Sequence, residues 1–95
     1  MKMIMLVYNE TLESEMLAFL AAQGVTKFTE LVAAHGRGDA GGMHLGTAVY
    51  PSLNRVRYMA LPEEQADALL TALRVFRDRW QAEGIQAFHW NCDTL

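Results

Sequence analysis

The residues best suited to binding chemistry gather in one short stretch, His35–Gly46, which holds five of the seven glycines and two of the three histidines of the chain. Glycine lets a backbone approach a ligand closely. An arginine such as Arg37 can hold an anion through two parallel hydrogen bonds, while backbone amides add further donors. The candidate ligand-binding residues are therefore His35, Gly36, Arg37, Gly38, Gly42, His44 and Gly46. A flexible connection that binds nothing is the alternative interpretation, because long glycine-rich loops are often disordered.

Four side chains are good ligands for a metal such as zinc or copper: His35, His44, His89 and Cys92. The first two flank the glycine-rich stretch and could meet across its base. His89 and Cys92 are three residues apart, which places them on opposite faces of a regular strand unless the chain bends at Asn91. Because the sequence has no Cys-x-x-Cys or His-x-x-x-His spacing, scattered polar residues are the competing interpretation. Metal binding would be the better interpretation if several subunits contributed ligands to one site.

Composition limits the classes of function. Hydrophobic residues make up 52% of the chain, an excess that a subunit interface would absorb. The net charge is −3 and no basic cluster is present, which argues against nucleic-acid binding. Cys92 is the single cysteine, as suits a reducing cytosol. The apolar run Met3–Tyr8 is too short to span a bilayer and lacks a signal-peptide pattern, so we predict a cytoplasmic protein without membrane insertion.

Hydrophobic periodicity predicts two helices among several strands. Apolar residues recur at helical spacing over Leu12–Leu20, and Gly24 is suited to end that helix in a left-handed conformation. A second helix opens at Pro62 with acidic residues in its first turn, and Gly84 is placed to end it. The predicted extended segments are Met1–Tyr8, Thr26–Ala34, Thr47–Tyr50, Arg55–Leu61 and Ile85–Trp90, with a turn at Pro51–Asn54.

This order, β-α-β-loop-β-α-β, predicts an α+β fold. It is the ferredoxin-like βαββαβ sandwich, a four-stranded antiparallel sheet with two helices on one face. Residues 1–95 form a single domain with a long flexible loop at about 36–53. The opposite face of the sheet is left uncovered, and we expect it to pair with other subunits.

The chain resembles the PII-like signalling proteins, a ferredoxin-like superfamily of trimeric sensors with a long loop between the second and third strands. The stretch His44–Thr47 and the proline after it are similar to a branch associated with efflux pumps of the resistance-nodulation-division type. The segments that carry the resemblance are Met3–Asn9, Gly36–Gly38, Gly42–Thr47, Val49–Asn54 and Glu83–Phe88.

The resemblance implies a homotrimer, not an enzyme, that binds a small ligand or metal at the subunit cleft and regulates a partner, such as a membrane efflux transporter, through the long loop. Arg55 and Arg57 would face the cleft or form interfacial ion pairs. The implied ligands are a divalent metal or an adenine nucleotide. Nucleotide-sensing relatives carry a glycine-rich basic phosphate loop before the last strand, and here that interval, Gln81–Gly84, has no lysine and one glycine. This departure argues against nucleotide binding.

Two alternatives remain open at this point. One is a dimeric ferredoxin-like enzyme of the monooxygenase or isomerase type, and the other is a CutA-like metal-handling trimer. The sequence gives little evidence for a pair of catalytic residues, because the helix dipole explains why glutamates occur in the first helical turns. Asp39 with His44, and His89 with Cys92, are the remaining pairs that could support catalysis.

Overall fold

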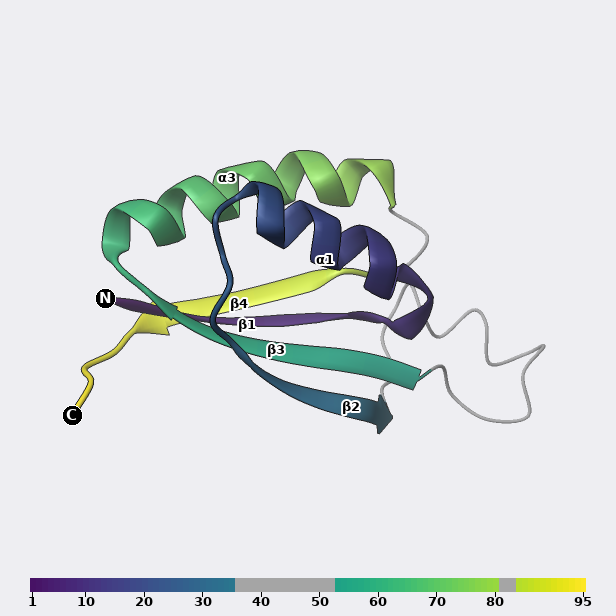
Figure 1. Cartoon of the computed structure of the whole chain (residues 1–95), viewed down its shortest axis with the longest axis horizontal. Helices are drawn as coiled ribbons and strands as arrows, with labels where there is room; N and C mark the ends of the chain where they lie inside the picture. The colour runs from purple at the N-terminus through teal and green to yellow at the C-terminus, as the bar shows by residue number, and fades with distance from the viewer. Residues whose placement is uncertain (36–52, 81–83) are drawn as a thin grey trace.

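The computed structural model describes residues 1–35, 53–80 and 84–95 (Figure 1). The described elements are β1 (Lys2–Asn9), the 3₁₀ turn η1 (Glu10–Leu12), α1 (Glu13–Ala22), β2 (Thr29–His35), β3 (Leu53–Leu61), α3 (Glu63–Arg79) and β4 (Gln86–Asn91). The predicted loop at about 36–53 lies outside the described residues except for Leu53, which begins β3. The predicted extended stretch Thr47–Tyr50 lies outside them as well.

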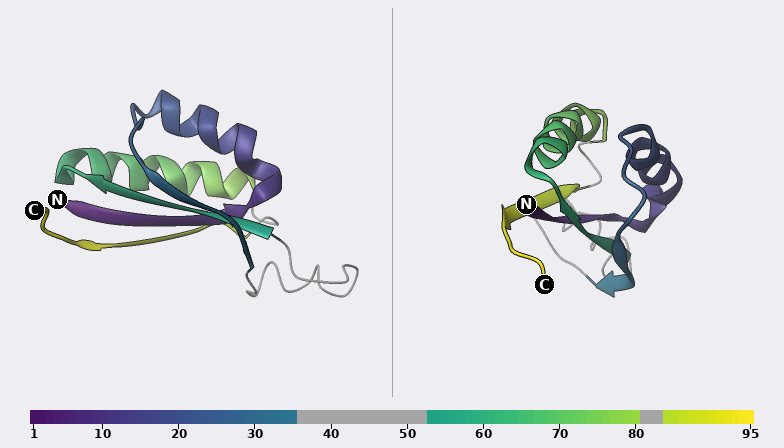
Figure 2. Two further views of the ribbon diagram at one scale, coloured as in Figure 1. Left: turned by 60° about the horizontal axis from the view of Figure 1, so that its bottom comes forward. Right: turned by 60° about the vertical axis from the view of Figure 1, so that its left-hand side comes forward.

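The four strands form one antiparallel sheet in the order β2-β3-β1-β4. The central strands β1 and β3 pair from Lys2 opposite Leu61 to Asn9 opposite Asn54. Both helices cover the same face of this sheet, as the two views of Figure 2 show. The predicted ferredoxin-like α+β sandwich is therefore confirmed.

The core lies between the sheet and the two helices. Alternate residues of β1 point into it, because successive strand side chains face opposite sides, and the predicted helical stripes of α1 and α3 cover them. The rings of Phe19 and Phe76 pack 4.6 Å apart and join the two helices. The buried members of the core are Ile4, Leu6, Tyr8, Leu12, Met16, Leu20, Val25, Met59, Leu61, Ala66, Leu69, Leu73 and Ile85.

The helix ends follow local rules, with one difference from prediction. The Asn9 side chain accepts a hydrogen bond of 2.9 Å from the Thr11 amide and so opens η1, and Gly24 has the expected left-handed φ of 76°. The prediction that the second helix runs to Gly84 is wrong, because α3 ends at Arg79. There the Trp80 amide donates to the carbonyl of Arg77, a tighter closure than an α-helical bond. Neither described helix is long and apolar enough to cross a membrane.

Strand β3 begins earlier than the sequence indicates. Leu53 and Asn54, predicted within a turn, instead pair with His35 and Ala34 of β2. Cross-strand pairing here overrides the local turn preference of the Pro-Ser-Leu-Asn run. The same strand pair contains an irregularity between Leu31 and Ala34, where the register shifts.

Candidate functional site

Charged side chains meet where the end of β1 and the η1 turn approach the start of β2 and the N-terminal part of β3. Residues 36–52, which include most of the predicted ligand-binding residues, connect the end of β2 to the start of β3. The group is called the charged cluster below, and its members are Tyr8, Glu10, Glu13, Glu30, Arg55 and Arg57.

Backbone register and the η1 turn bring these residues together. Arg55 and Arg57 are two apart on β3 and share the face that the helices cover. Glu30 lies directly opposite Arg57 on β2. The turn after β1 carries Glu13 over the same strands at the start of α1.

Arg57 is the largest fully buried side chain among the described residues, with 1% of its surface exposed. Its two terminal nitrogens bind the two carboxylate oxygens of Glu13 at 2.8 Å each, and its Nη2 also lies 2.7 Å from Oε2 of Glu30. Its Nη1 contacts the Tyr8 hydroxyl. The ring of Phe28 stacks on the guanidinium at 4.4 Å from its centroid. This bidentate, stacked arrangement is one that lysine could not reproduce.

Arg55 provides the second positive charge. Its Nη1 lies 3.2 Å from Glu13 and 3.4 Å from Glu30, and its Nη2 lies 3.5 Å from Glu10. The cluster thus holds two guanidinium groups and three carboxylates. One negative charge therefore remains uncompensated.

Glu13 is the least exposed of the three carboxylates. Burial raises the pKa of Glu13, and the nearby charges of Glu30 and Glu10 add to this rise while Arg55 opposes it. Burial also lowers the pKa of Arg57, although an arginine with two carboxylates in contact keeps its charge. Protonation of one carboxylate would bring the cluster to neutrality.

We expect the raised pKa of Glu13 to shape the pH dependence of stability. A pKa that is higher in the folded than in the unfolded protein contributes stability below the ordinary value near 4.5, and this contribution is lost as pH rises through the raised value. The free energy of unfolding of the natural protein, minus that of Glu13→Gln, should therefore grow as pH falls from 7 to 4. Urea unfolding of both proteins across this range measures the difference. A shrinking difference would mean that ion pairing lowers the pKa of Glu13 instead.

The charged cluster ties three strands and a helix together. Local sequence does not reveal it, because the helix dipole accounts for Glu13, and Arg57 is expected at a cleft or an interface. Glu13 does lie in the first turn of α1, but it also pairs with Arg57. Arg57 is buried within the protomer, so its expected place at a cleft or an interface is corrected. The signal was present in the sequence. Arg57 and Met59 are two residues apart and therefore lie on the same face of the strand, the face that packs on the helices. A buried arginine on that face requires a carboxylate partner.

The sheet face opposite the helices is apolar and without a covering element among residues 1–35, 53–80 and 84–95 (Figure 2). Its central row is Phe88, Met5 and Tyr58, which lie opposite one another on β4, β1 and β3. On the edge strands, Leu31, Phe88 and Trp90 are 52%, 51% and 45% exposed. Large apolar side chains on one continuous face are typical of a subunit interface.

The described residues hold only part of the predicted ligand and metal sites. His35 is the last residue of β2, at the base of the connection to β3. His89 and Cys92 line two different cavities and so are not brought together. Within the described ranges no three His, Cys, Asp or Glu side chains form a group that could hold a metal ion. The remaining predicted site residues, Gly36, Arg37, Gly38, Gly42, His44 and Gly46, lie outside the described residues.

Comparison with known proteins was made by sequence and by structure. No family model matches the chain, and no curated protein matches it. Among solved structures, the chain is similar to CPII, a nitrogen regulatory PII-like protein from Thiomonas intermedia K12, bound to ADP, AMP and bicarbonate. The TM-score is 0.72 at 19% identity, over 96% of this chain and 88% of CPII.

Two further structures agree with this likeness. The apo form of CPII has a TM-score of 0.63 at 14% identity, over 94% of this chain and 87% of that one. A candidate PII-like signalling protein from Thermus thermophilus has a TM-score of 0.65 at 21% identity, over 96% and 84%. The PII-like fold inferred from the sequence is therefore confirmed.

Proposed function

We propose that this chain is a PII-like regulatory protein of the cytoplasm. It acts as a homotrimer that binds a small ligand in the clefts between its subunits, and its role is binding, not catalysis. The observation that carries the proposal is the agreement of nearly the whole chain, 96% of it, with solved structures of PII-like proteins. A shared fold alone does not define function. Two features of the chain itself add support.

The first supporting feature is the bare apolar sheet face. A 95-residue domain with 52% hydrophobic residues leaves Phe88 and Trp90 half exposed on one side of a single sheet. Association of three copies through this face would bury these side chains, and apolar burial is the main driving force of association. A cyclic trimer repeats the same contact three times and closes.

The second supporting feature is the position of the glycine-rich segment in the chain. It is inserted between β2 and β3, the two strands that carry Glu30, Arg55 and Arg57 of the charged cluster. We propose that Arg37 and His44, with the amides of Gly36, Gly38, Gly42 and Gly46 and with His35 at the base, bind the ligand. Binding would order this segment, and its two states would differ in affinity for a partner. The partner that we propose is a membrane efflux transporter.

The ligand that we propose is an adenine nucleotide together with bicarbonate, since CPII binds ADP, AMP and bicarbonate. The interval Gln81–Gly84 has no lysine to meet the phosphates. Arg37 is therefore the proposed phosphate-binding cation, and its guanidinium fits a phosphate bidentately. A divalent metal held by His35, His44, His89 and Cys92 is the competing ligand.

Calorimetric titration tests this function. We expect ADP and AMP to bind, with bicarbonate strengthening the complex, and Arg37→Ala or His44→Ala to weaken binding at least tenfold without loss of the fold. Lys27→Ala is the matched control, because it also removes one positive charge, from an exposed residue outside the proposed site, and it should bind as the natural protein does. Unchanged affinity in both loop variants would refute the proposed site. Tight zinc or copper binding, lost on replacing the four metal-ligand candidates, would instead indicate a metal-handling protein.

A further inference from the structure

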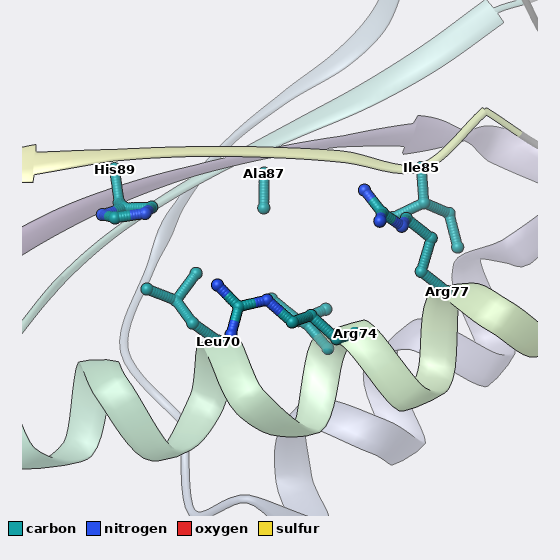
Figure 3. Close-up of a pocket in the computed structure, with 7 residues that line it drawn as sticks. Leu70, Arg74, Arg77, Ile85, Ala87 and His89 are labelled. Atoms are coloured by element: carbon teal, nitrogen blue, oxygen red, sulfur yellow. The ribbon is translucent and has the colours of Figure 1, made fainter.

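The cavity that His89 lines is on the helix-covered side of the sheet, between the C-terminal half of α3 and the edge strand β4. It has a volume of about 180 Å³. Figure 3 shows Arg77 extending from α3 toward the strand, Arg74 lying along α3 with its guanidinium near Leu70, and His89 extending from β4 toward the helix. The residues that line the cavity are Leu70, Leu73, Arg74, Arg77, Ile85, Ala87 and His89.

The cavity has an apolar floor and a cationic rim. Leu73 and Ile85 are buried at the floor, where they also belong to the core. The rim groups are the guanidinium groups of Arg74 and Arg77 and the imidazole of His89, all three on exposed residues. A ligand that fits both parts must combine an apolar body with an anionic group.

The rim cations have no carboxylate partner within residues 1–35, 53–80 and 84–95. Arg55, Arg57 and Lys2 each form an ion pair there, whereas Arg74 and Arg77 form none. Asp78 lies one turn beyond Arg74 and still makes no ion pair with it. Like charges three residues apart on a helix repel each other, and the helix C-terminal dipole offsets this only in part. A bound anion would relieve the repulsion.

We propose that this cavity binds a small organic anion, a carboxylate or phosphate on a compact apolar body. The anionic group would lie between the forks of Arg74 and Arg77, which match both oxyanions bidentately, and His89 would add a ring donor. The apolar body would lie on Leu73 and Ile85. Its size follows from the volume, because an engineered apolar cavity of about 150 Å³ binds benzene. The site is built within one protomer and does not rest on the proposed trimer or on the segment 36–52.

Phenyl phosphate is the probe that tests this site, with inorganic phosphate and phenol as its two halves. By nuclear magnetic resonance titration of the full chain, phenyl phosphate should bind once per protomer, at least tenfold more tightly than either half. The amide shifts should centre on Ile85, Ala87 and His89. Arg74→Gln and Arg77→Gln should each weaken binding at least tenfold while keeping the melting temperature.

Arg79→Gln is the matched control, because it makes the same change on the same helix outside the cavity lining. It should bind phenyl phosphate as the natural protein does. Equal weakening in all three variants would mean that only general charge attraction is present, which overturns the proposal. Shifts centred away from β4, or full displacement of phenyl phosphate by ADP, would also overturn a separate site.

Discussion

Replacing Arg57 by alanine is expected to lower the free energy of unfolding by about 3–5 kcal/mol, because it removes one side of a buried ion pair. Glu13, Glu30 and Tyr8 would lose their common partner. The variant would also leave an empty space beside Phe28. Domains of this size are stable by only about 5–15 kcal/mol, so the loss is a large fraction of the total. Urea unfolding at a fixed protomer concentration measures it.

Arg79→Ala provides the matched control for this experiment. Arg79 is exposed at the end of α3 and has no ion pair within the described part of the chain, so its removal should change stability by less than about 0.5 kcal/mol. A double variant, Arg57→Met with Glu13→Gln, should cost less than the sum of the two single changes by about 0.5–3 kcal/mol, since the partners are coupled. Additive effects, or a loss below about 1 kcal/mol for Arg57→Ala, would show that the charged cluster does not stabilise the packing of α1 on the sheet.

The sequence was sufficient to predict the layers of this fold. The continuous apolar run Met3–Tyr8 predicts a buried strand, and the helical spacing of Leu12, Met16 and Leu20 predicts a helix with one apolar face, so a sheet covered by helices follows. Boundaries were less predictable where a distant segment decides them. Leu53 joins β3 because β2 offers it hydrogen-bond partners, and no local pattern encodes that pairing.

The site was harder to predict than the fold, for a related reason. Glu13 and Arg57 are 44 residues apart in the sequence and meet only after β1, β3 and α1 are in place. A glutamate in a first helical turn has an adequate local explanation in the dipole, which conceals its long-range partner. Likewise, the rim of the α3–β4 cavity combines a helix and a strand whose charges look like ordinary surface residues when taken separately. Both clusters depend on how a helix packs on the sheet, and the charged cluster depends on strand register as well; hydrophobic periodicity specifies neither.

The same register makes the bare sheet face continuous, so one charge placed in its central row should dissociate the proposed trimer. Phe88 lies opposite Met5, which lies opposite Tyr58. Phe88→Glu would bury a carboxylate among apolar groups, which costs several kcal/mol unless it finds a partner. Threefold symmetry imposes that cost three times in each trimer. We expect the natural protein to sediment at about three times the protomer mass of 10.7 kDa and the variant at the protomer mass.

Val75→Glu is the control that separates the sheet face from general apolar exposure. Val75 is 65% exposed, more than Phe88, but it lies on α3 and away from the uncovered face. The Val75 variant should therefore remain trimeric at the concentration that dissociates Phe88→Glu. Dissociation of both variants would mean that added negative charge alone disrupts assembly. If the natural protein sediments as a dimer, the proposed trimer is wrong, and the dimeric ferredoxin-like enzyme becomes the better interpretation. Two copies would cover the sheet face, but they would not form the three clefts on which the proposed ligand sites depend.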